Sequence, residues 1–379
     1  MEKWVKEFKS INNDEVIIKF DAKEEPIILK STTTSENNIY HILYTENRIT
    51  LYVNYILNDE NWPLGNITEI NITDISKTMS VDEFLPLIKI NDEKIKNIDG
   101  WAPVGHNTHA GDCMPFSHNG VYHLFYLFDR RHHRSKWGLG AHQWAHVSTT
   151  DFIEWIQHPM AISIDHQYEG SICTGSVMEY NGVYYAYYAV RMSDGSPARL
   201  TYSISSDCIN FKKTNKYITL HEPFEPISAR DPKIIFGQDG KFHMFVTTSY
   251  KESGALAHLI SDDMENWNQL DVPIVTSSKG EWQPECPDYF YYNGWYYLIY
   301  SPGGTRYVMS RDPFGSWITP ENNLLNKDIL GIVPKTAVFD NRIIIAGWVS
   351  RDNQWGGTLK LGEAIQNDDG TLKFKSFIK

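Results

Sequence analysis

The chain has 379 residues, 41% hydrophobic and 22% charged, which is the balance of a globular protein with ample length to bury a core. Its 35 Lys and Arg against 47 Asp and Glu leave a net charge of −12, which argues against nucleic acid or an anionic membrane as the main partner. No run of 18 apolar residues is present, so the sequence predicts no membrane-spanning helix.

The cysteines and the first residues point to a cytoplasmic protein. The four cysteines form no C-x-x-C pair, which speaks against a zinc ribbon or a thioredoxin-type motif. The opening Met-Glu-Lys-Trp lacks the basic stretch and apolar run of a signal peptide. We therefore expect free thiols at Cys113, Cys173, Cys208 and Cys286.

Residues 1–100 differ in composition from the rest of the chain. They hold only two of the 25 glycines and one of the 14 histidines, and they are rich in Asn, Ile, Lys and Glu. Short apolar runs, such as the alternating stretch Ile49–Tyr55, predict strands. Residues 77–90 predict a helical or irregular passage to a linker. The sequence therefore predicts a small β-rich accessory domain over 1–100, with a sandwich as its candidate form.

From residue 101 the chain repeats a turn followed by aromatic residues. Asn-Gly or Asp-Gly opens the repeat at Asn119, Asn181, Asp239 and Asn293, and Asp340-Asn-Arg is a weaker fifth. These dipeptides favour type I′ hairpin turns, because both central residues take a positive φ. Four units add a Ser/Thr-rich segment with an Asp and a later aromatic residue, at 148–155, 205–211, 261–267 and 310–317.

Each repeated unit is about 40–60 residues long, which predicts one four-stranded sheet per unit, as is typical of a β-propeller. The fold class that we expect is all-β, with a five-bladed β-propeller catalytic domain over 101–379 after the small N-terminal module. A β-sandwich with frequent hairpins is the alternative.

Carboxylates recur within the repeat. Asp112, Asp231 and Glu285 stand 7, 8 and 8 residues before their turns, which predicts equivalent places on the innermost strands. Thr174 takes this place in the second unit, and Val333 lies near it in the fifth. Converging carboxylates repel one another and separate their pKa values, as an acid and nucleophile pair requires. A structural cap is the alternative.

Innermost strands of a propeller line its central channel, so the three carboxylates should converge at one mouth of this channel. The same counting places three loops at that mouth. They are Phe128–Trp137, Arg191–Gly195 and Pro302–Arg306. The first is basic over Arg130–Arg134, which suits an anionic substituent such as a sugar phosphate, although a solvated loop is the alternative.

Two further patterns carry less weight. His142-x-x-x-His146 has the spacing of a zinc pair, but it lacks the Glu of H-E-x-x-H and falls in a predicted strand. Cys286 follows Glu285 without a matched base, which favours a polarizable wall residue over a nucleophile. We expect no metal and no cofactor.

Several motifs occur in the order found in a known family. Ala229-Arg-Asp-Pro resembles its R-D-P motif, and Pro284-Glu-Cys-Pro-Asp its E-C motif. Residues 142–155 resemble H-W-G-H-A-x-S-x-D-L-x-x-W, Cys173-Thr-Gly-Ser resembles W-S-G-S, and residues 346–357 resemble the closing blade. Residues 101–379 thus resemble the glycoside hydrolases of family 32, the β-fructofuranosidases, invertases and fructanases.

The resemblance implies a retaining glycosidase that acts on terminal β-D-fructofuranosides of an oligosaccharide. It implies Asp112 as nucleophile, Glu285 as acid and base, and Asp231 as stabiliser of an oxocarbenium-like transition state. The expected substrate-binding residues are Arg230, Thr174, Trp137, His109, Trp282 and Trp348.

The first motif departs from the family pattern W-x-N-D-P-N-G. It reads His109-Ala-Gly-Asp-Cys-Met-Pro, so that Gly111 stands where the family has Asn, and Leu127 replaces the usual Gln. We therefore expect a fructo-oligosaccharide, fructan, difructose anhydride or phosphorylated sucrose to be a better substrate than sucrose. The alternatives are an inverting arabinofuranosidase or xylosidase, and a propeller that binds carbohydrate without catalysis.

Overall fold

The computed structural model describes residues 3–21, 25–33, 37–45, 48–62, 66–130, 141–166, 168–351 and 353–377. In these ranges the regular structure is nearly all strand, and the α-helices are the short α1 (Val81–Phe84) and α2 (Lys327–Leu330). None of the helices described is long and apolar enough to cross a membrane.

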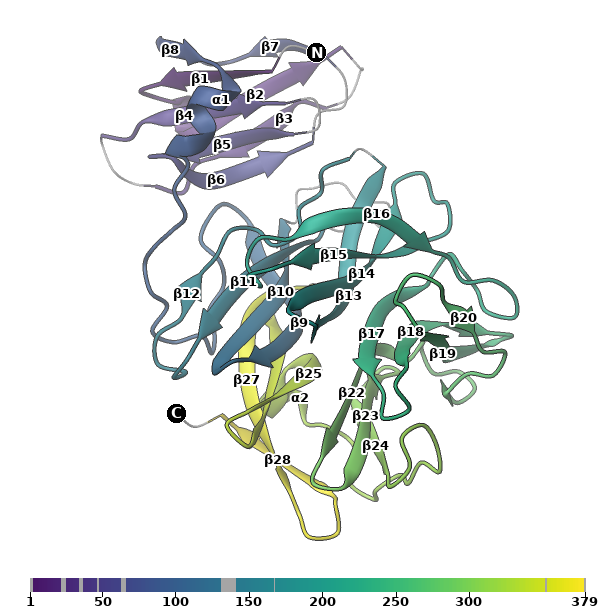
Figure 1. Cartoon of the computed structure of the whole chain (residues 1–379). Coiled ribbons are helices and arrows are strands. Elements are labelled where there is room, and N and C mark those ends of the chain that lie inside the picture. The colour runs from purple at the N-terminus through teal and green to yellow at the C-terminus, as the bar shows by residue number, and fades with distance from the viewer. Residues whose placement is uncertain are drawn as a thin grey trace.

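The N-terminal strands form two antiparallel sheets that lie apart from the remaining strands in Figure 1. One sheet has the order β6-β5-β4-β1-β8 and the other β3-β2-β7. Buried side chains of both sheets, among them Phe8, Ile18 and Leu51, share one cluster. The strands are β1 (Trp4–Phe8), β2 (Glu15–Phe20), β3 (Ile27–Lys30), β4 (Tyr40–Tyr44), β5 (Ile49–Val53), β6 (Ile56–Asn61), β7 (Ile67–Ile70) and β8 (Ile75–Met79).

The predicted helical passage contains α1. Ser80 begins this helix with a capping box, in which its hydroxyl accepts the N–H of Glu83 and the Glu83 carboxylate accepts the N–H of Ser80. Phe84 is buried with Val5 and Leu43 of the larger sheet. The helix therefore covers the face of this sheet that the smaller sheet leaves open.

The strands after residue 107 form antiparallel groups that follow one another along the chain (Figure 1). The first two groups are β9 (Thr108–His118), β10 (Val121–Arg130), β11 (Gln143–Thr149), β12 (Ile156–Gln157), and β13 (Glu169–Tyr180), β14 (Val183–Met192), β15 (Arg199–Ser205), β16 (Lys212–Ile218). The third is β17 (Arg230–Phe236), β18 (Phe242–Tyr250), β19 (Ser253–Ser261), β20 (Asn268–Gln269), β21 (Val275–Thr276). The last are β22 (Glu285–Tyr292), β23 (Trp295–Ser301), β24 (Arg306–Ser310), and β25 (Ile332–Phe339), β26 (Arg342–Ser350), β27 (Gly357–Gln366), β28 (Leu372–Ser376).

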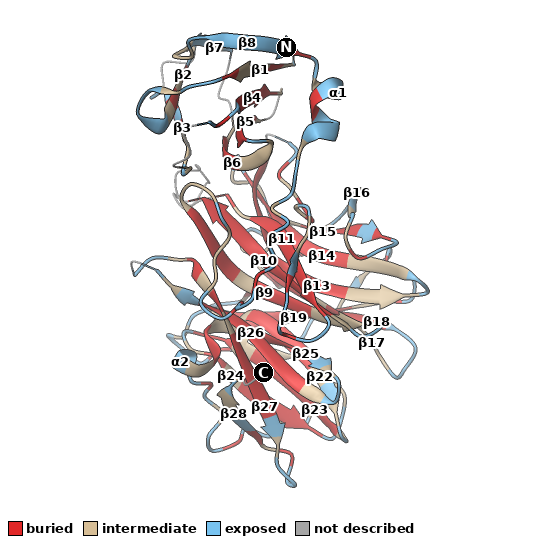
Figure 2. Ribbon diagram, turned by 90° about the vertical axis from the view of Figure 1, so that its left-hand side faces the viewer, coloured by how far each residue is buried: buried red, intermediate tan, exposed pale blue. Residues whose placement is uncertain are grey.

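The first strands of these groups lie against one another in a closed order. β9 packs against β13, β13 against β17, β17 against β22, β22 against β25, and β25 against β9. A bridge between Gly357 of β27 and Ala110 of β9 joins the end of the chain to its first group. Figure 2 shows that much of the length of these strands is buried.

The hairpin turns agree with the dipeptide signal in most units. Asn119, Asn181 and Asn293 have φ values of 49°, 51° and 43°, as type I′ turns require. The Asp239-Gly240 unit differs, because β17 ends at Phe236 and five residues connect it to β18. There the Asp239 carboxylate accepts a hydrogen bond from His243 instead.

The Asp of the second signature stabilises a turn. The Oδ1 atoms of Asp151, Asp207 and Asp263 each accept two backbone N–H groups two and three residues further on. This is the local bonding pattern of an Asx-type turn. The repeated acidic residue at the outer side of these units is therefore structural.

Candidate active site

Each innermost strand carries a bulge at the same height, where two residues face one residue of the next strand. The register of β9, β13, β17, β22 and β25 against their neighbours shifts at this point. The first bulge residue has a positive φ in three strands: 54° at Asp231, 52° at Cys286 and 39° at Val333. A bulge re-aims side chains, and here it turns them toward the space enclosed by the inner strands.

The three carboxylates occupy successive places of this bulge, which corrects the prediction of equivalent places. Glu285 directly precedes the bulge, Asp231 is the first residue of its bulge, and Asp112 is the second. The first bulge residue stands 8 residues before the turn at Asp231 but 7 before it at Cys286. Equal counts to the turn therefore conceal a shift of one residue.

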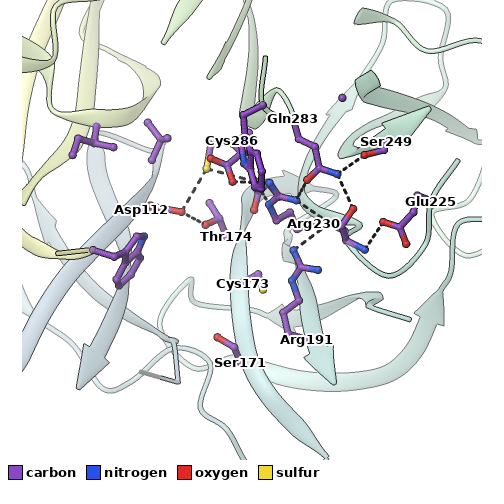
Figure 3. A pocket seen from close by; sticks show the side chains of 18 of the residues that line it. Asp112, Ser171, Cys173, Thr174, Arg191, Glu225, Arg230, Ser249, Gln283 and Cys286 are labelled. Atoms are coloured by element: carbon purple, nitrogen blue, oxygen red, sulfur yellow. Dashed lines mark hydrogen bonds and ion pairs between the residues drawn. The ribbon is translucent and has the colours of Figure 1, made fainter. Parts of the chain in front are cut away.

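Asp112 is held by donors from two other inner strands and from β26. Thr174 Oγ1 donates to its Oδ2 at 2.6 Å (Figure 3). Trp348 Nε1 donates to its Oδ1 at 2.9 Å. The Cys286 thiol lies 3.5 Å from the same Oδ2. Burial raises the pKa of Asp112, and the hydrogen bonds from Thr174 and Trp348 oppose this rise.

Asp231 lies on the other side of the Cys286 thiol. Its Oδ2 accepts the backbone N–H of Cys286 at 3.0 Å and lies 3.7 Å from Sγ. Arg230 Nε stands 3.6 Å from the same oxygen. Burial raises the pKa of the Cys286 thiol well above its usual value, so the sulfur is a neutral contact between two carboxylates.

Glu285 pairs with Arg230. Arg230 Nη2 donates to Glu285 Oε1 at 2.6 Å, and Arg230 Nη1 donates to the carbonyl of Ser228 at 3.0 Å. Burial raises the pKa of Glu285; Arg230 opposes the rise and the charge of Asp231 adds to it. Burial thus raises the pKa of both Glu285 and Asp112, and Glu285 is the one of the two that pairs with the arginine.

The carboxylates line one cavity of about 790 Å³. Of the predicted binding residues, the structure brings Arg230, Thr174, Trp282 and Trp348 to this cavity. Trp282 is 62% exposed, which places its ring at the mouth. Arg191 also lines the cavity, and its guanidinium donates to the carbonyls of Ile227 and Ser228.

Other predicted residues lie elsewhere. His109 is buried beside a neighbouring cleft that also contains Arg351, and it does not line the cavity with the carboxylates. Arg130 is 1% exposed and ion-pairs with Asp59, so it does not belong to a basic rim. Trp137 and residues 131–134 lie outside the described residues.

The two histidines of the presumed zinc spacing do not meet. His142 lines the cavity, whereas His146 is buried in a pair with His123, with 3.0 Å between Nε2 of His146 and Nδ1 of His123. His146 lies within β11, whereas His142 precedes this strand, so the alternation of strand side chains does not bring the two rings together. Within the described ranges no group of three or more His, Cys, Asp or Glu is arranged to hold a metal ion.

Sequence reasoning missed two residues of the cavity wall, His142 as a cavity residue and Trp355. The Trp355 ring lies 4.2 Å from the His142 ring and 5.4 Å from that of Trp348. A Cβ built on Gly111 would stand 2.2 Å from the Trp355 ring. The replacement of the family's Asn by Gly111 was therefore the signal that another side chain fills this space.

A model of the glycosyl hydrolases family 32 N-terminal domain matches residues 113–323. The chain belongs to this family. A curated relative, the raffinose invertase of Escherichia coli, is 24% identical over 72% of this chain and 64% of its own length. A probable sucrose-6-phosphate hydrolase of Psychromonas ingrahamii is 23% identical over 67% of this chain and 51% of its own length. The chain thus spans less than two thirds of either relative.

Solved structures share the fold. Fructan 1-exohydrolase IIa of Cichorium intybus matches 73% of this chain and 60% of its own, with a TM-score of 0.62 and 19% identity. A family 43 β-xylosidase/α-arabinofuranosidase from a compost microbial metagenome matches 76% of this chain and 100% of its own, with a TM-score of 0.57 and 17% identity. At these identities the likeness concerns the fold alone.

Proposed function

We propose that this family 32 chain is a retaining glycoside hydrolase that releases a terminal β-D-fructofuranosyl unit. The observation that carries the proposal is that Asp112 and Glu285, from different inner strands, line one cavity together with Asp231. Family membership and the names of the relatives, an invertase and a fructan exohydrolase, support fructose as the sugar that is released.

The first step is the transfer of the fructosyl unit to the protein. An oxygen of the Asp112 carboxylate forms a bond to the anomeric carbon, while the bond from this carbon to the leaving oxygen breaks. Glu285 gives its proton to that oxygen, so the leaving group departs as a neutral alcohol. The raised pKa of Glu285 supports this role, because the carboxyl group stays protonated at higher pH.

The second step returns the protein to its starting state. The Glu285 carboxylate takes a proton from water, and the water oxygen bonds to the anomeric carbon as the bond to Asp112 breaks. Asp231, held by the Cys286 N–H, faces the positive charge that develops on the sugar. Arg230 ion-pairs with both Asp231 and Glu285, and its positive charge offsets the repulsion between these two carboxylates.

For the substrate, we propose a fructo-oligosaccharide, fructan, difructose anhydride or phosphorylated sucrose in preference to sucrose. Gly111 and Leu127 bring no polar side-chain atom to the sugar, which supports a changed selectivity. The exposed ring of Trp282 at the mouth offers a stacking surface for the leaving part of a longer substrate.

We also propose the architecture in which this site sits. Residues 101–379 form a five-bladed β-propeller, and residues 1–100 form an accessory β-sandwich domain. The closed order of the inner strands and their common bulge support the propeller. A cytoplasmic location is part of the same proposal, and the four buried free cysteines support it.

Sugar release from a panel tests the function. The purified protein is incubated with sucrose, sucrose phosphate, inulin, levan, short fructo-oligosaccharides, difructose anhydrides and aryl arabinofuranosides. We expect fructose, released with retention as seen by NMR of the first product, and its loss in Asp112→Asn and Glu285→Gln. Release of arabinose with inversion, or no release from any substrate, contradicts the proposal.

A further inference from the structure

Strand β6 is one of the places where the N-terminal sheets contact the rest of the chain. Glu60 of this strand is fully buried. Its Oε1 accepts a hydrogen bond from Gln143 Nε2 at 2.9 Å and stands 3.8 Å from Arg130 Nε. Arg130 Nη1 also donates to the carbonyl of Asn58 at 2.9 Å, and Arg48 stands 3.4 Å from Glu60 Oε2. One strand of the N-terminal sheet thus binds the end of β10 and the start of β11.

The residues next to these contacts face the other way. Successive side chains of a strand point to opposite faces, so Asp129 beside Arg130 in β10 turns from the N-terminal sheet. His142 directly precedes β11 and bonds to Asp129. His142 Nδ1 donates to Asp129 Oδ2 at 2.7 Å, and Asp129 is 1% exposed. His142 lines the cavity that contains Asp112.

The His142 ring is fixed in this position. Asp129 accepts the hydrogen bond from Nδ1, and the ring of Trp355 lies 4.2 Å from the imidazole. The backbone N–H of His142 donates to Ser171 Oγ at 3.0 Å. Nε2 is therefore the ring nitrogen that remains for a ligand. Leu127 and Gly111 leave this wall without other polar side-chain atoms at their places.

We propose that the N-terminal sheet positions a side chain that binds sugar in the pocket. Glu60 holds the ends of β10 and β11, and these ends place His142 so that Nε2 binds a hydroxyl of the fructosyl unit. Glu60 is a positioning residue and His142 a substrate-binding residue. This inference rests on the proposed function for the identity of the sugar, but the coupling between Glu60 and His142 is a property of the chain alone.

The coupling is tested first without any substrate. The ring nitrogens of His142 are observed by ¹⁵N NMR in the full chain and assigned with His142→Phe. We expect Glu60→Ala to move these signals, and Glu60→Gln to move them less because an amide still accepts from Gln143. The matched control is Glu69→Ala, whose exposed carboxylate pairs with Lys19 in the same N-terminal part.

Sugar binding is tested next with fructose as the probe. We expect Glu60→Ala and His142→Ala each to raise the dissociation constant roughly tenfold, the size of one lost hydrogen bond. In the double variant the two effects should not add, because Glu60 acts through His142. For the substrate of the sugar panel that the protein hydrolyses, both single variants should raise KM by a larger factor than they lower kcat.

Two results overturn the inference: unmoved His142 signals in folded Glu60→Ala, or additive effects in the double variant. If Glu60→Ala does not fold, as judged by circular dichroism, Glu60→Gln is measured in its place with the same criteria. Failure of the proposed function looks different. In that case no fructoside of the panel is cleaved, while the ring signals of His142 still respond to Glu60.

Discussion

The indole of Trp348 donates to the Oδ1 of Asp112 across 236 residues of sequence, at 2.9 Å. This hydrogen bond lowers the pKa of Asp112. Replacement of Trp348 by Phe removes the donor and therefore raises that pKa. We expect Trp348→Phe to move the acid limb of the kcat/KM profile to higher pH and to reduce kcat roughly tenfold. The control is Trp267→Phe, whose indole N–H donates to the carbonyl of Met264. An unchanged acid limb would show that the bond does not tune the carboxylate.

Arg230 should control the opposite limb. The guanidinium lowers the pKa of Glu285, whose protonated form acts in the first step. We expect Arg230→Met to leave Glu285 protonated to higher pH, so the basic limb moves upward while the maximal rate falls. The measurement is kcat/KM between about pH 4 and pH 9. A basic limb that moves downward contradicts the assignment of Glu285 as the acid.

The buried histidine pairs should make the fold sensitive to acid. Burial lowers the pKa of His123 to about 4 and that of His258 to about 3, and each bonds a second histidine. Both are neutral in the folded chain, whereas the unfolded chain protonates them below about pH 6.5. The free energy of unfolding therefore falls as the pH drops below this value, by about 1 kcal/mol for each histidine at pH 5.5.

Urea unfolding between pH 7.5 and pH 5 measures this effect. His258→Phe should reduce the slope of the unfolding free energy against pH, while His221→Gln at an exposed position should leave it unchanged. An unaltered slope in His258→Phe would mean that other groups carry the acid sensitivity.

Gly111 cannot regain a side chain while Trp355 stays in place. A Cβ at residue 111 would lie 2.2 Å from the Trp355 ring, well inside contact distance. We expect Gly111→Asn to lose about 1–3 kcal/mol of stability and to lower activity, as overpacked sites do. The further change Trp355→Ala should recover the stability. Thermal melting checks both, with Gly315→Ala as control, because a Cβ there meets nothing within 4 Å.

The repeat signal predicted most of the strands and the turns, because type I′ turns and alternating aromatic residues are local properties. The prediction of a type I′ turn at Asp239 was wrong, because its dipeptide lies inside a five-residue connection between β17 and β18. The place of Glu285 relative to Asp231 depends on the bulge, and a bulge is set by the pairing of neighbouring strands. A count along one strand cannot show it.

The repeat predicted that the carboxylates share one cavity, whereas neighbours that contacts between distant segments bring to the cavity wall were missed. Asp112, Asp231, Glu285 and Arg230 reach one cavity. Arg130 was predicted in a basic rim, yet its place next to acidic β6 comes from packing between distant segments. His142 belongs to the wall for the same reason, because strand alternation is visible in sequence and the partner of each face is not.

The closed order of the inner strands determines when the site can form during synthesis of the chain. Strand β9, which carries Asp112, meets β25 and β27 only after more than 200 further residues have been added. Contacts so far apart in sequence form slowly, since a long loop of chain must close first. A nascent chain that has passed residue 300 therefore holds all three carboxylates but not the indole and the strands that enclose Asp112. We expect activity to appear late in synthesis, and until then the apolar side chains of β9–β11 that pack against β26 and β27 stay uncovered.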